Sequence, residues 1–395
     1  MKLKYKKQLL EKLKGMTDIR KHSHKIIFPL HEVVFMTLFA MIRGNVIYDD
    51  IVYWMSYQKN DKYLKKLFNY KKGEYINIPS RATLQRLLVN ILNDELEIIF
   101  RDFFTPFIEE KNVALDGKWL NGSDINGQYV QQKHQAVLNI LCKDTKIVFG
   151  HVLLNKDKKS EIPAFTDLLE QEFFSKNGQI LSFDALTTQI PILNKINEQG
   201  NFYMAKVKGN QLNLKNDVIS KINEFFKPTD TYIADIIGAT ENNKSVKRTT
   251  QIYQNIGADL VLFNSGFKNI QTLVKITKEI TDLKTKKLKI TTQYLIANFK
   301  TTAQDFHDKI LQHWLVETYH YHLDRLTKED DHIAYKNPFC MSILRSFTIN
   351  LYQLFLNKYK GQTYVLSSYK TTMANIKRAC VHDAEFALDL FEMKY

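Results

Sequence analysis

The sequence predicts an α/β protein with an all-α N-terminal region, and two contrasts along the chain support this. Residues 1–105 carry apolar side chains at helical spacing. From Val113 onward, short apolar segments rich in β-branched residues alternate with helical segments, as in a mixed sheet covered by helices. The chain has 395 residues, enough for two or three domains that each bury a core.

The N-terminal region is predicted to be a small helical bundle. The stretch 28–42 is apolar on most sides, which is typical of a central helix, and Gly44 follows it as a C-cap. Ser80 is the expected N-cap of a later helix that carries leucines at helical spacing. Arg81 and Arg86 lie on that helix, where they would either contact phosphate groups or form a solvated face.

The region after Val113 is predicted to alternate strands and helices. The expected strands are 113–118, 135–142, 147–155, 180–185 and 202–209, and the second and third form a hairpin. The expected helices are 161–174, with Ser160 as N-cap, and 190–198. Three strands, helix, strand, helix, strand is the order of an RNase H-like core.

The remainder divides into three parts. Residues 210–300 contain short β-like pieces, one of them at 260–263, separated by polar runs, and are predicted to form a β-rich insertion. Two long helices, 302–328 and 337–358, are expected to close the core, and a helical tail comes after them. The predicted domains are therefore 1–105, 106–209, 210–300, 301–360 and 361–395.

The charge of the chain favours a polyanionic partner. Lysine and arginine number 56 against 42 acidic residues, which gives a formal net charge of +14. Such an excess indicates nucleic acid first and an acidic membrane second. The most apolar stretch, 26–42, is interrupted by Pro29, His31 and Glu32 and is too short to span a bilayer.

The cysteines and the N-terminus favour a cytoplasmic protein. Cys142, Cys340 and Cys380 are odd in number and lie far apart, which argues against disulfides and a structural zinc site. No apolar core or small-residue cleavage site follows the basic start, so no signal peptide is expected.

Two predicted strands end in the same way, with an aspartate followed by a small residue. They end at Asp116–Gly117 and Asp184–Ala185. A carboxylate at the end of a buried strand needs a cation or strong donors, and two on neighbouring strands repel unless a divalent metal lies between them. Singly, each aspartate is more often a turn or N-cap residue; the matched pair favours a metal site.

A third acid is expected from the helix 302–328. On a helical wheel, His313, Glu317, His320 and Asp324 form one stripe, whose alternative interpretation is an ordinary polar face. Because Mg²⁺ takes carboxylate oxygens, Glu317 is the candidate ligand and the histidines are at most helpers. His313 and His134 are further candidates to orient water or DNA.

These segments resemble one known family along most of the chain, from about Asp18 to Leu354. The resembling motifs, in order, are PSRATLQRLL (79–88), VALDGK (113–118), KKSEI (158–162), LSFDA (181–185), KGNQ (208–211) and HWLVE (313–317). They are similar to insertion-sequence transposases of the ISAs type, also called the H-repeat-associated group, although KKSEI has Lys159 and Ser160 where that family has Ser and Asn. Two further differences matter: Thr318 stands where the family has Asn, and the segment from Glu317 to Asp324 is one residue shorter. One lost residue rotates the remaining turns of a helix by about 100°.

The resemblance implies a DDE transposase that cuts insertion-sequence ends and joins them to target DNA. It implies that Asp116 bridges two Mg²⁺ ions, that Asp184 and Glu317 hold one each, and that Mn²⁺ substitutes. The interval from Asp184 to Glu317 is about twice that from Asp116 to Asp184, which leaves room for the inserted strands. Residues 1–105 would be the associated DNA-binding domain, and the active complex would be a homodimer on terminal inverted repeats in the bacterial nucleoid.

Contacts to DNA are expected near the acids as well. Lys206 and Lys208 lie near the end of a predicted core strand and are candidates for phosphates close to the scissile bond, with exposed lysines as the alternative. Neither HExxH nor GxxxxGK[ST] occurs, which excludes a zinc hydrolase and a P-loop ATPase as far as sequence can. A decayed or domesticated DNA-binding transposase, and a nuclease without strand transfer, stay open.

Overall fold

The computed structural model describes residues 4–20, 26–71, 74–108, 111–120, 135–154, 165–166, 168–170, 174, 178–184, 188–225, 227–236, 244–255, 266–267, 269–331, 337–359 and 371–392. The chain divides into two compact units. Unit 1 comprises Met1–Glu109, Gly117–Lys156 and Thr318–Tyr395, and unit 2 comprises Glu110–Asp116 and Asp157–Glu317. Strand β1 (Asn112–Leu120) and helix α11 (Leu315–Thr327) contribute residues to both units.

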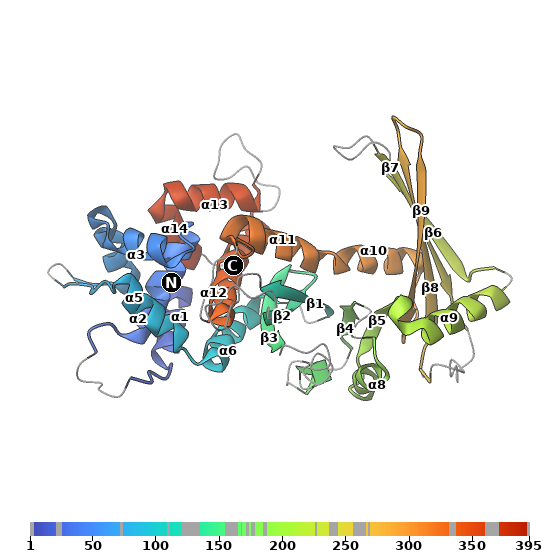
Figure 1. The fold of residues 1–395 in the computed structure, drawn as a ribbon, viewed down its shortest axis with the longest axis horizontal. Helices are drawn as coiled ribbons and strands as arrows, with labels where there is room; N and C mark the ends of the chain where they lie inside the picture. The colour runs from blue at the N-terminus through green and yellow to red at the C-terminus, as the bar shows by residue number, and fades with distance from the viewer. Residues whose placement is uncertain are drawn as a thin grey trace, which may run out of the picture. The chain divides into compact units, whose positions relative to one another are not determined.

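The N-terminal part of unit 1 is helical, as predicted (Figure 1). Its helices are α1 (Lys4–Lys14), α2 (Leu30–Ile42), α3 (Tyr48–Ser56), α4 (Asp61–Phe68), α5 (Arg81–Val89) and α6 (Asn93–Phe104), with short 3₁₀ turns η2 (Gln58–Asn60) and η3 (Thr105–Phe107). Almost all of α2 is buried, which confirms it as a central helix. Gly44 follows α2 with a φ of 86°, in the left-handed region that suits glycine.

The predicted N-cap of α5 is confirmed. The Ser80 hydroxyl accepts a hydrogen bond from the Thr83 amide at 3.3 Å. Such a side-chain acceptor satisfies one of the free amides at a helix start. The cap fixes where α5 begins and therefore places Arg81 in its first turn.

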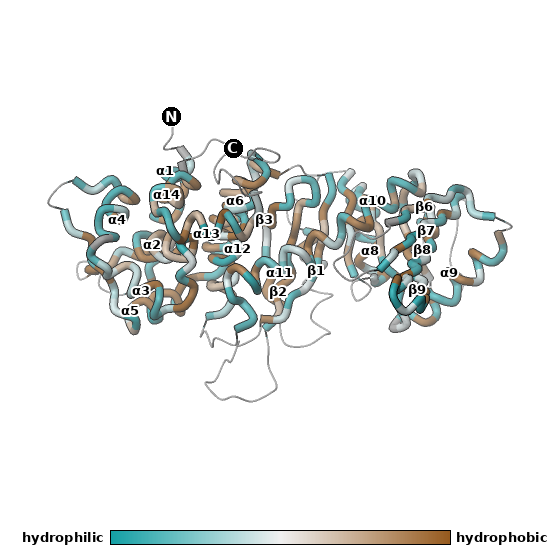
Figure 2. Tube along the Cα trace, turned by 90° about the horizontal axis from the view of Figure 1, so that it is seen from above, coloured by the Kyte–Doolittle hydropathy of each residue, from teal (hydrophilic) through white to brown (hydrophobic). Residues whose placement is uncertain are grey.

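The C-terminal helices complete the core of unit 1. They are α12 (Pro338–Lys358), α13 (Met373–His382) and α14 (Ala384–Glu392), and hydropathy along them can be followed in Figure 2. Every residue of α12 from Phe339 to Phe355 is buried. This helix is long and apolar enough to cross a membrane, but 94% of its most apolar 18-residue stretch is buried within the protein. It is therefore a core helix.

The N-terminal and C-terminal helices of unit 1 share that core. The rings of Phe35 and Phe391 lie 5.3 Å apart between α2 and α14. The Tyr352 hydroxyl of α12 donates to the carbonyl of Ile42 at 2.7 Å. Burial of such aromatic side chains is the largest favourable contribution to folding.

The predicted hairpin is also confirmed in unit 1. Strands β2 (Gln135–Cys142) and β3 (Ile147–Leu154) pair antiparallel, with Ala136 opposite Leu154, and the strand order is β3-β2-β1. His151 on β3 is buried, with Nδ1 2.8 Å from Glu97 Oε2 and Nε2 2.8 Å from Ser346 Oγ. These contacts tie β3 to α6 and α12.

Unit 2 contains a mixed sheet in the order β1-β4-β5-β9-β8-β7-β6. Its further strands are β4 (Ile180–Phe183), β5 (Phe202–Val207), β6 (Asp230–Ile236), β7 (Lys244–Tyr253), β8 (Thr272–Asp282) and β9 (Leu288–Ala297). Strands β1, β4 and β5 run parallel to one another. The pairs β5–β9, β9–β8, β8–β7 and β7–β6 are antiparallel. Helix α8 (Ile190–Glu198) falls on the predicted residues. The expected mixed α/β fold class is confirmed.

Unit 2 contains one helix that was not predicted and one predicted helix that is wrong. In the segment 210–300, expected to be rich in short strands, the turn η6 (Gly209–Gln211) leads into helix α9 (Leu212–Glu224), and the strands follow it. The buried residues Leu214, Val218 and Ile222 lie at four-residue spacing, a helical signal that the polar flanks obscured. The single predicted helix 302–328 is broken at Trp314 into α10 (Ala303–His313) and α11.

The break at Trp314 has a local cause. The Trp314 amide donates to the Leu311 carbonyl, three residues back, at 3.2 Å. A three-residue bond tightens the last turn and ends the regular helix. The predicted helix 161–174 with Ser160, and the strand piece 260–263, lie mostly or wholly outside the described residues.

Candidate active site

Asp116 and Asp184 occupy neighbouring positions on adjacent parallel strands of unit 2. In the register of β1 and β4, Ala114 is opposite Ser182 and Leu115 is opposite Phe183, and the acid comes next in each case. Asp184 directly follows β4 as predicted, but the prediction that a strand ends at Asp116 is wrong, because β1 continues to Leu120. Neighbouring strands lie about 4.8 Å apart. Since side chains alternate along a strand, the register assigns both carboxylates to one face.

Asp184 is paired with a lysine from the next strand. The Nζ of Lys208 lies 2.6 Å from Asp184 Oδ2, with the two side chains 48% and 35% exposed. Lys208 directly follows β5, which is parallel to β4, so it reaches the same edge. Lys206 is half-buried on β5 two residues earlier. Of the two predicted phosphate contacts, Lys208 is therefore the one beside an acid.

Helix α10 is tied to the sheet face of the two acids. The His313 Nδ1 lies 3.0 Å from the Oγ of Ser182, and the Ser182 hydroxyl is also within 3.3 Å of the Val113 carbonyl. Ser182 is 1% exposed and lies two residues before Asp184, on the same face of β4. Glu317 follows His313 by four residues and is exposed in the first turn of α11.

The predicted stripe of four polar residues does not share one environment. His313 contacts Ser182 in unit 2, whereas in unit 1 His320 Nε2 lies 3.0 Å from Asn139 Nδ2 and Asp324 binds Lys118. Burial lowers the pKa of His320 to about 3, so its imidazole is neutral and accepts the Asn139 amide proton. The break at Trp314 is the reason, because it separates His313 from the regular turns of α11.

A buried charged cluster in unit 1 was not expected from the sequence. The Lys118 Nζ lies 2.7 Å from Asp324 Oδ1, 3.0 Å from Asp330 Oδ1 and 4.0 Å from Glu329 Oε2. Arg345 lies 3.8 Å from the other Glu329 oxygen. Burial raises the pKa of Glu329 despite these cations. The cluster links β1 to α11, and the sequence had included Lys118 only as the last residue of VALDGK (113–118).

The donor chemistry of the two aspartates suits a divalent metal. Among the residues that the structure describes, no three His, Cys, Asp or Glu side chains form a group that could hold a metal ion. Asp116 and Asp184 by themselves supply carboxylate oxygens, the ligands that hard divalent cations take. Their register and shared face fit such a cation, whereas Glu317 does not complete a group of three with them.

The other predicted contacts lie elsewhere. Arg81 and Arg86 are exposed on α5 in unit 1, where Arg81 Nε lies 3.0 Å from Asp49 Oδ1 and Arg86 donates to Thr83 Oγ1 at 3.3 Å. Neither arginine is engaged in the core, so both remain available to a ligand. His134 and the segment 158–162 lie outside the described residues.

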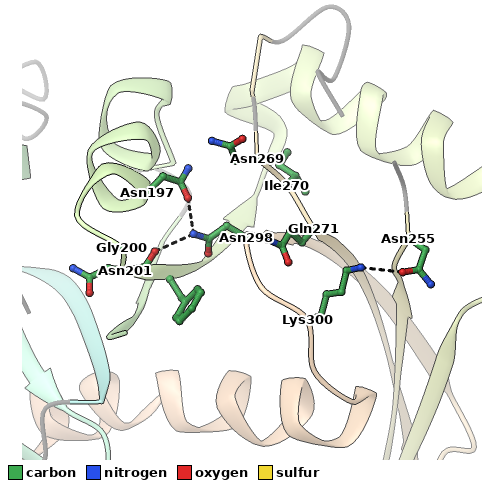
Figure 3. Close-up of a pocket in the computed structure, with 10 residues that line it drawn as sticks. Asn197, Gly200, Asn201, Asn255, Asn269, Ile270, Gln271, Asn298 and Lys300 are labelled. Carbon is green, nitrogen blue, oxygen red and sulfur yellow. Dashed lines mark hydrogen bonds between the residues drawn. The ribbon is translucent and has the colours of Figure 1, made fainter. Parts of the chain in front are cut away.

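A polar hollow of about 720 Å³ lies at the opposite end of β5 (Figure 3). It is lined mainly by carboxamides, and Phe202, the first residue of β5, belongs to it. Asn298 Nδ2 donates to Asn197 Oδ1 at 2.6 Å and to the Asn201 carbonyl at 3.0 Å. Lys300 donates to Asn255 at 2.9 Å. The hollow lies at the start of β5, whereas Lys208 and its partner Asp184 lie beyond the other end of that strand, so the hollow is separate from the two acids.

Comparison with known proteins gives two matching family models. The model described as "Transposase DDE domain" matches residues 109–339, and the one described as "DDE_Tnp_1-associated" matches residues 10–104. The first range includes Asp116, Asp184 and Glu317.

Relatives of similar length match most of the chain. The "H repeat-associated putative transposase YhhI" of Escherichia coli strain K12 is 26% identical over 82% of this chain and 84% of its own length. The "Putative transposase YncI" of Escherichia coli O157:H7 is 26% identical over 82% of this chain and 80% of its own length. "Putative protein YbfL" of strain K12 is 26% identical over 82% and 84%.

Proposed function

Because the chain belongs to the DDE transposase family, we propose that it cleaves the ends of an insertion sequence and joins them to target DNA. The observation that carries this proposal is the parallel register of β1 and β4, which assigns Asp116 and Asp184 to neighbouring positions on one face of the sheet. The His313–Ser182 contact supports it further, since it holds the end of α10 against that face four residues before Glu317.

The proposed fold of the catalytic part is an RNase H-like core. The strand orders β3-β2-β1 and β1-β4-β5 support this proposal. So do the strand directions, because β3 is antiparallel to β2 while β1, β4 and β5 are parallel. Residues 106–209 and 301–360 would form the core, and 210–300 would be an insertion. Residues 1–105 would contribute DNA binding, and 361–395 would form the tail.

In the proposed mechanism, Asp116, Asp184 and Glu317 would hold two Mg²⁺ ions, with Mn²⁺ as a substitute. Bound metal of this kind lowers the pKa of water and stabilises the entering and leaving oxygens of a phosphodiester. The acids supply oxygen ligands, and His313 positions α10 through Ser182. Lys208, whose Nζ lies 2.6 Å from Asp184 Oδ2, would exchange this carboxylate partner for a DNA phosphate.

The two steps would use the same residues. The first frees a 3′-OH at the element end with water as nucleophile, and the second uses that 3′-OH against target DNA. A homodimer would hold two ends, and the reaction would take place on the nucleoid in a bacterial cytoplasm.

Substitution of the acids tests the proposal. Asp116→Ala, Asp184→Ala and Glu317→Gln should each reduce cleavage of end-containing DNA by on the order of 10³-fold or more in Mg²⁺ or Mn²⁺. DNA binding should survive, because the basic contacts remain. Asp308→Asn, an exposed acid on α10, is the matched control and should cut normally. Near wild-type cutting by an acid variant would remove that residue from the site.

A DNA-binding relic is the second candidate, favoured by one observation: within the described part of the chain, Glu317 does not complete a group of three acids. Strand transfer of a pre-cleaved end with a free 3′-OH separates the candidates, because it bypasses the hydrolytic step. Joining that needs divalent metal and Glu317 supports the transposase. Specific binding without nicking or joining in any metal supports the relic, and nicking without joining indicates a nuclease.

A further inference from the structure

Three basic side chains share one face of the outer strands of unit 2, and we call them the cation face: Arg248, Lys278 and Lys289. Arg248 on β7 lies directly opposite Lys278 on β8. Lys289 on β9 is opposite Ile280 and is therefore the diagonal neighbour of Lys278. Like charges at such cross-strand positions are unfavourable. The fold therefore maintains a concentration of positive charge that does not stabilise the sheet.

This face is the one against which α10 packs. Alternation along β7 and β8 assigns Arg248 and Lys278 to the face of the buried residues Ile252, Val274 and Ile276. These residues belong to a core that includes Phe306 of α10. In Figure 1, β7, β8 and β9 extend past α10, and the residues of β7 and β9 become more exposed toward that end.

Trp314 marks the point where α10 ends and the cation face begins. The Arg248 guanidinium carbon lies 5.2 Å from the centroid of the indole, and Lys278 Nζ lies 5.6 Å from it. An indole attracts cations but carries no negative charge, so it orients both groups without neutralising them. Within the described residues, none of the three cations has an ion pair with a carboxylate.

The electrostatics agree with this geometry. Partial burial, Arg248 and Lys289 all lower the pKa of Lys278, in that order. A neighbouring carboxylate would act in the opposite direction. The β8–β9 turn adds more positive charge through Lys284, Lys286 and Lys287. An anion of several charges would relieve the repulsion.

We propose that the cation face binds the phosphate backbone of duplex DNA beside the element end that is held for cleavage. Trp314 precedes Glu317 by three residues, so their Cα atoms lie within about 10 Å of each other. A duplex whose scissile phosphate reaches Glu317 therefore passes Arg248 and Lys278. The face supplies affinity and not sequence recognition, because it offers point charges and a guanidinium to phosphates. The inference rests on the proposed function, since it deepens the assignment of the same site.

The test measures how the affinity of the full chain for a plain linear DNA duplex depends on salt. Each phosphate contact contributes about 0.9 to the slope of log affinity against log salt. The double variant Arg248→Gln/Lys278→Gln should lower this slope by about two. The double variant Lys247→Gln/Lys275→Gln removes equal charge from the opposite face of the same strands and should leave the slope nearly unchanged.

Two further variants keep the test sharp. Arg248→Lys/Lys278→Arg preserves the charges and should retain the wild-type slope. If the glutamine double variant fails to fold, Lys278→Gln alone should lower the slope by about one. Equal losses from both faces, or no loss from the cation face, would overturn the proposal.

Failure of this inference can be distinguished from failure of the proposed function. Binding to a plain duplex does not require cleavage, so the salt slope is measured even for a protein that never cuts. A slope that depends on the cation face in a protein without acid-dependent cleavage would remove the catalytic role and keep the DNA surface. If cleavage depends on the acids but the salt slope is unchanged by the cation-face substitutions, the catalytic role is supported and the proposed DNA surface is wrong.

Discussion

The Nζ of Lys208 lies 2.6 Å from the Oδ2 of Asp184. The lysine ammonium therefore binds a carboxylate oxygen for which a metal ion would compete in the proposed site. Lys208→Ala should therefore lower the Mg²⁺ concentration needed for half-maximal cleavage, since the competing ammonium is gone. The same variant should lower activity at saturating Mg²⁺ by about 10- to 100-fold, because a phosphate contact is lost. Titration of the cleavage rate with Mg²⁺ checks both effects.

The opposite directions of these effects separate them from a structural defect. A merely misfolded site would need more Mg²⁺ and would also turn over more slowly. Lys227→Gln, an exposed lysine that follows α9, is the control and should change neither quantity appreciably. A higher Mg²⁺ requirement in Lys208→Ala would refute the competition.

The exposed arginines of α5 should contribute to recognition of the element end. Arg81→Gln/Arg86→Gln in the full chain should weaken binding to end-containing DNA and reduce the salt slope by about two. The full chain is needed because the N-terminal helices share a core with α12 and α14. Mobility-shift titrations at several salt concentrations give the result. Lys62→Gln, exposed on α4, is the control, and an equal effect from it would argue against a specific role for α5.

Lys118 should be essential for stability. Lys118→Met would leave the carboxylates of Asp324, Glu329 and Asp330 with one cation fewer in a buried place. Breaking a fully buried ion pair from one side costs about 3–5 kcal/mol, but Asp324 and Asp330 are 28% and 37% exposed, so water screens part of the interaction. Denaturant unfolding should therefore show a loss on the order of 1–3 kcal/mol.

A second substitution shows whether the cost arises from unpaired charge. Adding Asp324→Leu to Lys118→Met should recover part of the lost free energy of unfolding, because one uncompensated carboxylate is removed. Lys111→Met, exposed just before β1, is the control and should change stability little. Strictly additive losses in the double variant would contradict the proposed coupling.

The pH dependence of stability should contain a contribution from His320. Its pKa is about 3 in the folded chain, chiefly because of burial, against about 6.5 when unfolded. Between these values the unfolded chain binds more protons, so the free energy of unfolding decreases as the pH falls from 6.5 toward 3. The maximal slope is about 1.4 kcal/mol per pH unit for one such group.

His320→Gln should therefore have a shallower decrease of stability between pH 6.5 and 4 than the wild type. Denaturant unfolding at a series of pH values measures both slopes. His382→Gln, an exposed histidine on α13, serves for comparison and should keep the wild-type slope. If His320→Gln also kept it, the buried neutral imidazole would not be the cause.

Local chemistry in the sequence determined much of the secondary structure. Ser80 and Gly44 fix helix ends through a side-chain acceptor and a left-handed backbone, both of which depend only on neighbouring residues. The apolar stretch 28–42 contains the buried helix α2, because side chains that are apolar on most sides of a helix are stable only in a core. Asp116 and Asp184 were also visible, because an acid that ends an apolar run is a local pattern, although β1 continues past Asp116 to Leu120.

Long-range pairing was decided only by the tertiary structure. The register that sets Ala114 opposite Ser182 joins residues far apart in the chain, and the sequence carries no local record of it. The same holds for the Lys118 cluster and for Arg248 and Lys278 over Trp314. A charge on a strand has the same local appearance whether it faces solvent, an acid or another cation. Which neighbour the charge contacts depends on the strand register, which joins residues far apart in the chain. The sequence therefore determined the local elements, whereas only the tertiary structure determined these contacts.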